Sequence, residues 1–280
     1  MQPIAYLNGV FCGMEEAKVS IEDRGFQFAD GVYEVIAARS RQPFRLRQHL
    51  ERLQRSADAI GLAVDLDSLT LPKVIDEGIA RCGCDDVMVY IQLTRGAAPR
   101  TLECPAAMRP TVVVTFRALP VFSHELRERG VALRSVRDTR WAYCSVKSVS
   151  LLANVLLKRE TQRDGFFDAL IIGPDDLVRE TTSANVFAVV NGILRTPPLS
   201  EHILHGVTRD YVLECAQDAG IERREEQMLL RDVIVAEEVF LCSTTKDIVP
   251  VSSIDGQTIA SGLPGPVTRR LLRFFAPPGR

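Results

Sequence analysis

The order of the strand-like and helix-like segments is the feature that most constrains the fold of this chain. Short apolar segments typical of strands follow one another in hairpins and only sometimes alternate with segments typical of helices. The first two, Ile4–Leu7 and residues 10–12, flank Asn8-Gly9, the pair that a tight type I′ turn favours. A doubly wound parallel sheet would need strict alternation of strands and helices. The pattern therefore predicts an α+β fold with mixed sheets.

Apolar periodicity gives the expected bounds of the other elements. We expect strands at 32–38, 44–46, 87–94, 111–116, 131–136, 168–172, 177–179, 186–190, 193–195, 239–242 and 248–254. We expect helices at 50–60, from 72 to about 79, and at 150–163, 208–219, 229–236 and 266–275. Residues 96–110 hold three prolines and show no periodicity, so they predict a long loop of the kind that often carries function.

Composition restricts the class of protein. The 280 residues carry 34 Lys and Arg against 36 Asp and Glu, and this near balance without a basic block disfavours nucleic acid and anionic lipid as partners. The longest apolar segments are far too short for a membrane-spanning helix. The first residues lack the basic start and apolar run of a signal peptide. We expect a cytoplasmic protein of about two domains that binds small molecules.

Metal and disulfide chemistry are not indicated. The seven cysteines are odd in number and scattered, with no C-x-x-C pair, which disfavours a disulfide framework and a zinc knuckle. His202 and His205 lie three residues apart, but no second ligand pair follows them. We therefore expect no bound metal.

Two loops of small polar residues could bind an anion. Residues 205–210 open a predicted helix and offer free backbone amides and a hydroxyl, although a plain N-cap is the common alternative. Residues 242–246 follow a predicted strand and could form a second hydroxyl-rich nest. Glycine-rich phosphate motifs and a G-x-S-x-G elbow are absent from the sequence, which disfavours nucleotide enzymes and α/β-hydrolases.

Two charged residues have both a plain and a functional interpretation. Lys147 stands between a predicted strand and an apolar helix, so it either extends to solvent or is a partly desolvated amine suited to Schiff-base chemistry. Glu180 ends a predicted strand and is either a solvated turn acid or a functional carboxylate. The residues alone leave both questions open.

Six ordered motifs together resemble the fold type IV pyridoxal-phosphate (PLP) enzymes, the class IV aminotransferases. Within that group they look like the D-amino acid (D-alanine) transaminases. Each motif is weak by itself, but the set runs from about residue 4 to residue 274. The motifs are residues 22–34, Thr94-Arg95-Gly96, Arg140-Trp141 with Lys147-Ser148, residues 180–187, Gly206-Val207-Thr208-Arg209 and Ser243-Thr244-Thr245.

The resemblance implies a two-domain α/β subunit and a homodimer. It implies a small domain at 1–117, an interdomain loop at 118–123 and a large domain at 124–280, with PLP bound between the domains. It also implies amino acids and 2-oxo acids as partners. The expected activity is transfer of an amino group from a D-amino acid, of the D-alanine or D-glutamate type, to pyruvate or 2-oxoglutarate.

Matching positions imply the cofactor site. Lys147 falls on the family's Schiff-base lysine and catalytic base, which acts through a pyridoxamine intermediate. Glu180 falls on the acid beside the pyridine nitrogen. The remaining cofactor-binding positions are a phosphate-binding arginine, Arg52, a leucine that supports the ring, Leu204, and the phosphate cup of Val207, Thr208, Ser243 and Thr244.

Matching positions also imply the substrate site. Tyr33 and Arg100 fall on residues that hold the substrate carboxylate, and Arg100 is expected to reach in from the other subunit. The family has a histidine two positions beyond that arginine, where this chain has Leu102. The alternatives are a branched-chain L-amino acid transaminase, an (R)-amine transaminase and an aminodeoxychorismate lyase of the same fold.

Overall fold

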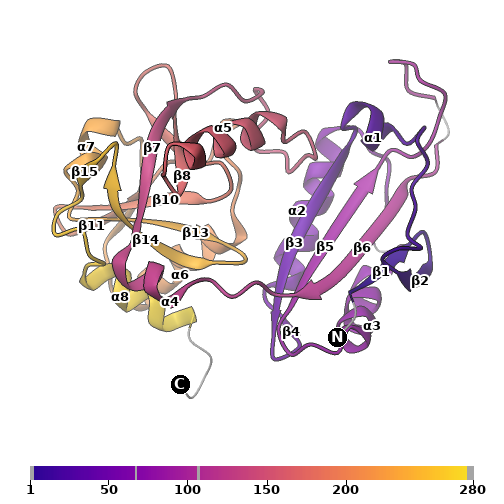
Figure 1. Ribbon diagram of the computed structural model, residues 1–280, viewed down its shortest axis with the longest axis horizontal. Coiled ribbons are helices and arrows are strands. Elements are labelled where there is room, and N and C mark those ends of the chain that lie inside the picture. The colour runs from indigo at the N-terminus through magenta and orange to yellow at the C-terminus, as the bar shows by residue number, and fades with distance from the viewer. Residues whose placement is uncertain (1–2, 67, 106–107, 276–280) are drawn as a thin grey trace. The chain divides into compact units, whose positions relative to one another are not determined.

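A computed structural model describes residues 3–66, 68–105 and 108–275 of the chain (Figure 1). The chain forms two compact units. Unit 1 contains the residues up to Pro120 together with Val146–Leu151, and unit 2 contains Val121–Ser145 and the residues from Leu152 onward. The bounds expected from the resemblance placed an interdomain loop at 118–123 and Lys147 in the C-terminal domain. In the structure, the segment that carries Lys147 belongs to unit 1 instead.

Backbone pairing explains why this short segment joins unit 1. The amide of Tyr33 donates to the carbonyl of Lys147 at 2.9 Å, and the amide of Val149 donates to the carbonyl of Gly31 at 3.1 Å. Residues 146–149 thus extend the sheet at the edge of a strand that lies more than a hundred positions earlier in the sequence. Periodicity reports on local structure only, so it gave no sign of this pairing.

Unit 1 is built on one antiparallel sheet that, within the described residues, has six strands in the order β2-β1-β6-β5-β3-β4. The strands are β1 (Ile4–Leu7), β2 (Val10–Gly13), β3 (Gly31–Arg39), β4 (Gln42–Pro43), β5 (Val87–Thr94) and β6 (Thr111–Ala118). The helices are α1 (Arg24–Phe28), α2 (Leu46–Ala59) and α3 (Leu71–Cys82).

Alternation of side chains creates the core of unit 1. In β5, Val87, Val89, Ile91 and Leu93 are fully buried, whereas the residues between them are half-buried. Helix α2 packs against β3, and α3 packs against β1, β5 and β6 (Figure 1). The buried side chains of these elements form one continuous apolar cluster. This cluster fixes β3 and α2, which carry Tyr33, Glu34, His49 and Arg52.

Unit 2 contains a mixed sheet, with nine strands among the residues described. The order is β12-β11-β10-β13-β14-β7-β8-β9, and β15 pairs with β14; β7 lies parallel to both β14 and β8. The strands are β7 (Val131–Arg137), β8 (Asp168–Ile172), β9 (Val178–Thr181), β10 (Asn185–Val190), β11 (Ile193–Thr196), β12 (Arg223–Glu225), β13 (Glu238–Ser243), β14 (Asp247–Ile254) and β15 (Gln257–Thr258).

The helices of unit 2 are α4 (His124–Arg129), α5 (Leu152–Arg163), α6 (Val207–Asp218), α7 (Leu230–Ile234) and α8 (Pro266–Leu272), followed by a short 3₁₀ turn at Arg273–Phe275. Two apolar clusters fill the space around the sheet, and Phe187 and Phe240 stack at 5.1 Å in one of them. The central strands β10, β13 and β14 are therefore buried and carry loops whose positions are well fixed.

Most of the expected elements are present, and the α+β class with mixed sheets is confirmed. The opening hairpin is confirmed, with Ile4 opposite Gly13 and Leu7 opposite Val10. The strand expected at 44–46 is wrong in its bounds, because the short strand β4 ends at Pro43, Arg45 has a left-handed backbone conformation (φ 52°) and α2 begins at Leu46. Helices α1 and α4 were not expected, since five or six residues are too short to show helical periodicity.

The packing of α3 against β6 generates the first prediction. A Cβ added to Gly78 would lie 2.0 Å from Cζ of the buried Phe116 ring, so only glycine fits at this helix position. We expect Gly78→Ala to lower the free energy of unfolding by roughly 1–3 kcal/mol despite alanine's better helix propensity. Asp76→Ala, at an exposed position of the same helix, should change it by less than about 0.5 kcal/mol. Chemical denaturation measures both, and equal stabilities would contradict the packing argument.

Candidate active site

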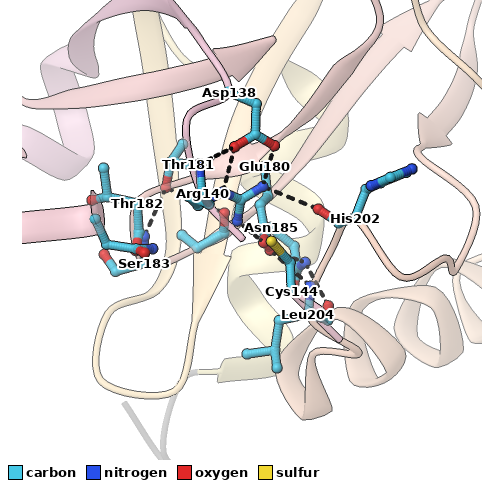
Figure 2. Close-up of polar contacts among 12 residues, drawn as sticks. Asp138, Arg140, Cys144, Glu180, Thr181, Thr182, Ser183, Asn185, His202 and Leu204 are labelled. Carbon is cyan, nitrogen blue, oxygen red and sulfur yellow. Dashed lines mark hydrogen bonds and ion pairs between the residues drawn. The ribbon is translucent and has the colours of Figure 1, made fainter. Parts of the chain in front are cut away.

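Glu180 is buried and surrounded by hydrogen-bond donors. It lies in β9, and Figure 2 shows its carboxylate beside Arg140, Asn185 and Leu204. Arg140 Nη1 donates to Oε1 at 2.5 Å, while Asn185 Nδ2 and the Leu204 amide donate to Oε2 at 3.3 and 3.1 Å. All three partners donate hydrogen bonds to Glu180. An ionised carboxylate only accepts hydrogen bonds, so these contacts favour the ionised form of Glu180. The interpretation of Glu180 as a solvated turn acid is therefore wrong.

The start of helix α6 lies next to Asn185. The N-cap residue is Gly206, and a Cβ at this position would come within 2.0 Å of Asn185 Oδ1, so glycine allows the close approach. Val207 and Thr208 form the first turn and are buried. Among the described residues, no side chain caps this turn, which leaves its amides directed out of the helix end.

The second polar loop lies beside the same asparagine. Asn185 pairs with Cys242 across β10 and β13, so Ser243 and Thr244 follow directly at the end of β13. Both are half-buried. The register thus places the two loops that the sequence analysis singled out on either side of Asn185.

These features fit a phosphate-bearing cofactor with a protonated ring nitrogen. An uncapped helix start and neighbouring hydroxyl groups are donors suited to a phosphate. An ionised, buried carboxylate is the natural partner of a cationic ring nitrogen. The observations that carry this fit are the missing side-chain cap of α6 and the donor-only surroundings of Glu180, both within the described residues.

Lys147 is attached to β3 and α2 of unit 1. Its amide donates to Ser56 Oγ at 3.2 Å, and its carbonyl accepts from Tyr33. The Nζ atom lies 4.2 Å from the centre of the Tyr33 ring, a cation–π distance. The lysine is half-buried. The structure thus brings together two residues, Lys147 and Tyr33, that the resemblance assigned to the reaction.

Arg52 belongs to a fully buried charge cluster that the sequence analysis did not identify. Its Nε and Nη2 donate to the two carboxylate oxygens of Glu34 at 2.6 and 2.9 Å, and His49 Nδ1 lies 2.8 Å from Glu34 Oε2. Burial opposes ionisation of Glu34, but the Arg52 charge and the hydrogen bonds from His49 and Arg52 outweigh it and lower the pKa of Glu34 to about 2. Burial lowers the pKa of His49, although Glu34 acts against this change.

The Glu34 cluster orients the Arg52 side chain. A guanidinium that binds a carboxylate through two nitrogens has a fixed plane. The only hint in the sequence was that Glu34 directly follows Tyr33 in the first motif. A carboxylate in the middle of a strand gives no sign of which helix residues it contacts.

The loop that carries Arg100 and Leu102 is fastened to α1. Arg24 Nη1 donates to the Thr101 carbonyl at 2.7 Å, and the Arg100 guanidinium lies 4.5 Å from the centre of the Phe28 ring. Leu102 is 85% exposed in the single chain. The loop thus has a defined backbone anchor and presents an apolar side chain at its surface.

In the parts of the chain that the structure describes, no group of three or more His, Cys, Asp or Glu side chains could hold a metal ion. Within the same residues, no helix combines the length and the apolar character needed to span a membrane.

Comparison with known proteins identifies a matching family and a relative with an aminotransferase name. Residues 31–254 match the family described as "Amino-transferase class IV". The chain is 38% identical over 265 residues to a D-alanine aminotransferase of Bacillus licheniformis, covering 94% of this chain and 93% of that protein.

Solved structures agree on the fold. The branched-chain amino acid aminotransferase of Escherichia coli superposes with a TM-score of 0.90 at 25% identity, covering 98% of this chain and 94% of that one. The T.th. branched-chain amino acid aminotransferase, solved with pyridoxamine 5′-phosphate, gives a TM-score of 0.87 at 25% identity, covering 98% and 93%.

The Glu34 cluster generates a prediction on pH. Below the usual pKa of histidine, 6.5, the unfolded chain takes up a proton that buried His49 resists, so stability falls as pH falls. Glu34 adds a second loss between its usual pKa of 4.5 and about 2. His49→Asn keeps a donor for Glu34 but does not titrate. We expect its thermal unfolding midpoint to change less between about pH 7 and pH 5 than that of the wild type.

The matched control is His124→Asn, because the His124 side chain is 84% exposed and lies on a short surface helix. It should keep the pH dependence of the wild type. If His49→Asn and the wild type lost stability equally over this range, His49 would not be a neutral buried group.

Proposed function

This chain belongs to the class IV aminotransferases, and on that premise we propose that it transfers an amino group from a D-amino acid to a 2-oxo acid. The donor would be of the D-alanine or D-glutamate type, and the acceptor would be pyruvate or 2-oxoglutarate. The observation that carries the proposal is the 38% identity to a D-alanine aminotransferase over 94% of the chain. The cofactor of the family is PLP. When bound, PLP supplies a protonated pyridine ring that accepts electron density as the substrate's Cα proton leaves.

The cofactor-binding positions that the resemblance implies would hold the cofactor. The amides of Val207 and Thr208, with the hydroxyls of Thr208, Ser243 and Thr244, would bind the phosphate, assisted by Arg52. Glu180 would accept a hydrogen bond from the ring nitrogen, and Leu204 would support the ring. The support for these roles is the uncapped start of α6 and the donor-only surroundings of Glu180.

Lys147 would be the catalytic base. Its amine would take the proton from the substrate's Cα and deliver it to C4′ of the cofactor, as general base and then general acid. The pairing of residues 146–149 with β3 supports this role, because it fixes the backbone from which the amine extends. The Tyr33 ring, 4.2 Å from Nζ, would limit the directions that the amine can take.

The substrate carboxylate would be bound by Tyr33 and Arg100. We propose a homodimer in which Arg100 acts in the partner's site. Apolar side chains on α5 support an oligomer, since Leu152 and Val155 are 70% and 56% exposed in the single chain. We further propose that the enzyme is cytoplasmic, where its seven free cysteines would stay reduced.

The main alternative is a branched-chain L-amino acid transaminase. The observation that favours it is the TM-score of 0.90 with the Escherichia coli enzyme, although identity is lower there than with the D-alanine aminotransferase. Leu102 also replaces a polar residue of the D-amino acid group. An (R)-amine transaminase and an aminodeoxychorismate lyase are further members of the fold. Initial rates with D-amino acids, L-amino acids and (R)-amines, with pyruvate or 2-oxoglutarate as acceptor, decide among the transaminases.

Removal of the Lys147 amine tests the catalytic assignment. We expect Lys147→Ala to bind PLP noncovalently through the phosphate site but to lose at least about 10²-fold in single-turnover rate, because a positioned base is missing. Lys73→Ala, on the exposed side of α3, should keep full activity. Borohydride reduction of the wild type followed by peptide mapping should place the cofactor on Lys147. Label on another lysine, or a wild type that binds no PLP, would contradict the proposal.

Leu102 generates a prediction on donor preference. A histidine at this position adds a hydrogen bond to a charged carboxylate, which contributes on the order of 1.5–3 kcal/mol. We therefore expect Leu102→His to raise kcat/KM for D-alanine by about tenfold or more and to leave primary amines unchanged or slower.

The control for this substitution is Leu263→His, at a position 55% exposed in unit 2. It should leave the donor preference as in the wild type. An unaltered ratio of D-alanine to primary-amine rates in Leu102→His would mean that this loop does not contact substrate.

A further inference from the structure

Asp138, Arg140 and Glu180 form a continuous chain of alternating charge in unit 2. Arg140 donates from Nε to Asp138 Oδ1 at 3.0 Å and from Nη2 to Asp138 Oδ2 at 2.9 Å. Its third nitrogen, Nη1, donates to Glu180 Oε1 at 2.5 Å. The guanidinium is therefore shared between two carboxylates, as Figure 2 shows. Its side chain is 4% exposed, so water screens these interactions little.

We propose that Asp138 and Arg140 are positioning residues, which fix the direction of the Glu180 carboxylate and leave it one net negative charge for the ring nitrogen of PLP. The inference rests on the proposed role of Glu180 and extends it to two further residues.

The backbone fixes where the Arg140 side chain begins. Asp138 directly follows β7, and its amide donates to the Ile172 carbonyl at the end of β8 at 2.9 Å. Asp138 Oδ1 also accepts the Arg140 amide at 3.0 Å and closes a local turn. Arg140 Nη2 further donates to the His202 carbonyl at 3.0 Å. Arg140 thus connects the end of β7 to the loop before α6.

The ionisation of the cluster follows from these contacts. Burial opposes the charge on Arg140, but the hydrogen bond to Asp138 and the charge of Glu180 outweigh it and raise the pKa of the guanidinium. Burial also opposes ionisation of Asp138, yet its hydrogen bond to Arg140 and the arginine's charge lower the pKa of that carboxyl. Asp138 and Arg140 are therefore charged near neutral pH, and the donors around Glu180 favour its ionised form.

The sum of charges explains why two carboxylates are needed. Arg140 and Glu180 alone would form a neutral pair, and a neutral pair attracts a pyridinium weakly. Asp138 balances the arginine, so these three residues together carry one negative charge; the charge of Arg179, which also acts on Asp138, lies outside this hydrogen-bonded chain. Arg140 donates to Glu180 Oε1, whereas Asn185 and Leu204 donate to Oε2.

The direct test is Asp138→Asn, which keeps the size of the side chain and an acceptor oxygen but removes the charge. The ¹⁵N chemical shift of ring-labelled PLP reports protonation of the ring nitrogen and does not depend on turnover. One neighbouring charge changes a protonation equilibrium by roughly tenfold or more, so we expect a shift toward the unprotonated ring and a comparable rise in the PLP dissociation constant. The single-turnover rate with D-alanine should fall by a similar factor.

The matched control is Asp176→Asn. Asp176 pairs with Arg137, the last residue of β7, and this pair is about two-thirds exposed. The same chemical change at the carboxylate that pairs with the residue before Asp138 should leave the ¹⁵N shift, the PLP affinity and the rate unchanged. Arg140→Lys cannot bridge two carboxylates but leaves the sum of charges unchanged, so its ring protonation should stay closer to that of the wild type than in Arg140→Gln, which leaves two carboxylates uncompensated.

The outcomes separate the inference from the function on which it rests. A wild type without bound PLP would overturn both. Wild-type values in Asp138→Asn, with PLP bound to both proteins, would overturn the inference alone. If Asp138→Asn did not fold, Arg140→Lys and Arg140→Gln would carry the test, and equal ring protonation in these two variants would overturn the inference. Failure of all three variants to fold would assign the cluster a structural role only, which also overturns it.

Discussion

The arrangement of the polar groups in unit 2 depends on the contacts of the Asn185 side chain. Its Nδ2 donates both to Glu180 and to the Leu204 carbonyl, and its Oδ1 lies against Gly206 at the start of α6. Its backbone pairs with Cys242 at the end of β13. The Asn185 amide group therefore contacts the Glu180 carboxylate, the loop before α6 and the start of α6. Its strand, β10, pairs with β13 and so fixes the second polar loop. Because Asn185 is buried, a side chain without both a donor and an acceptor would leave some of these groups unpaired.

The buried charged clusters of the two units differ in their net charge. In unit 1, Glu34 and Arg52 balance each other and His49 is held neutral, so that cluster carries no net charge. In unit 2, Asp138, Arg140 and Glu180 sum to one negative charge. A balanced cluster orients a side chain, because breaking such a buried pair costs about 3–5 kcal/mol. An unbalanced cluster also exerts a field on a bound group. The first arrangement suits positioning, and the second suits attraction of a cation.

The sequence predicted the helices and strands better than the contacts between residues that lie far apart in the chain. Strand β5 was expected at its observed bounds because its alternating apolar residues face one core. The neighbours of Lys147 could not be predicted, because its segment pairs with β3 through backbone atoms that carry no sequence signal. Arg140 and Asn185 both stood inside recognised motifs, yet their contacts with Glu180 depend on how β7, β9 and β10 are arranged in three dimensions. Contacts between distant parts of the sequence follow from the sheet and not from local spacing.

The charge balance in unit 1 also bears on how a phosphate would be bound. The Arg52 charge is already matched by Glu34, which stays ionised down to about pH 2. The cluster therefore has little net positive charge to offer to an anion. The amides at the start of α6 and the hydroxyls of Thr208, Ser243 and Thr244 carry no formal charge, but they are directional donors and the helix dipole favours an anion there. Affinity for phosphate would then depend more on the exact placement of α6, which Gly206 and Asn185 set, than on any single cationic side chain.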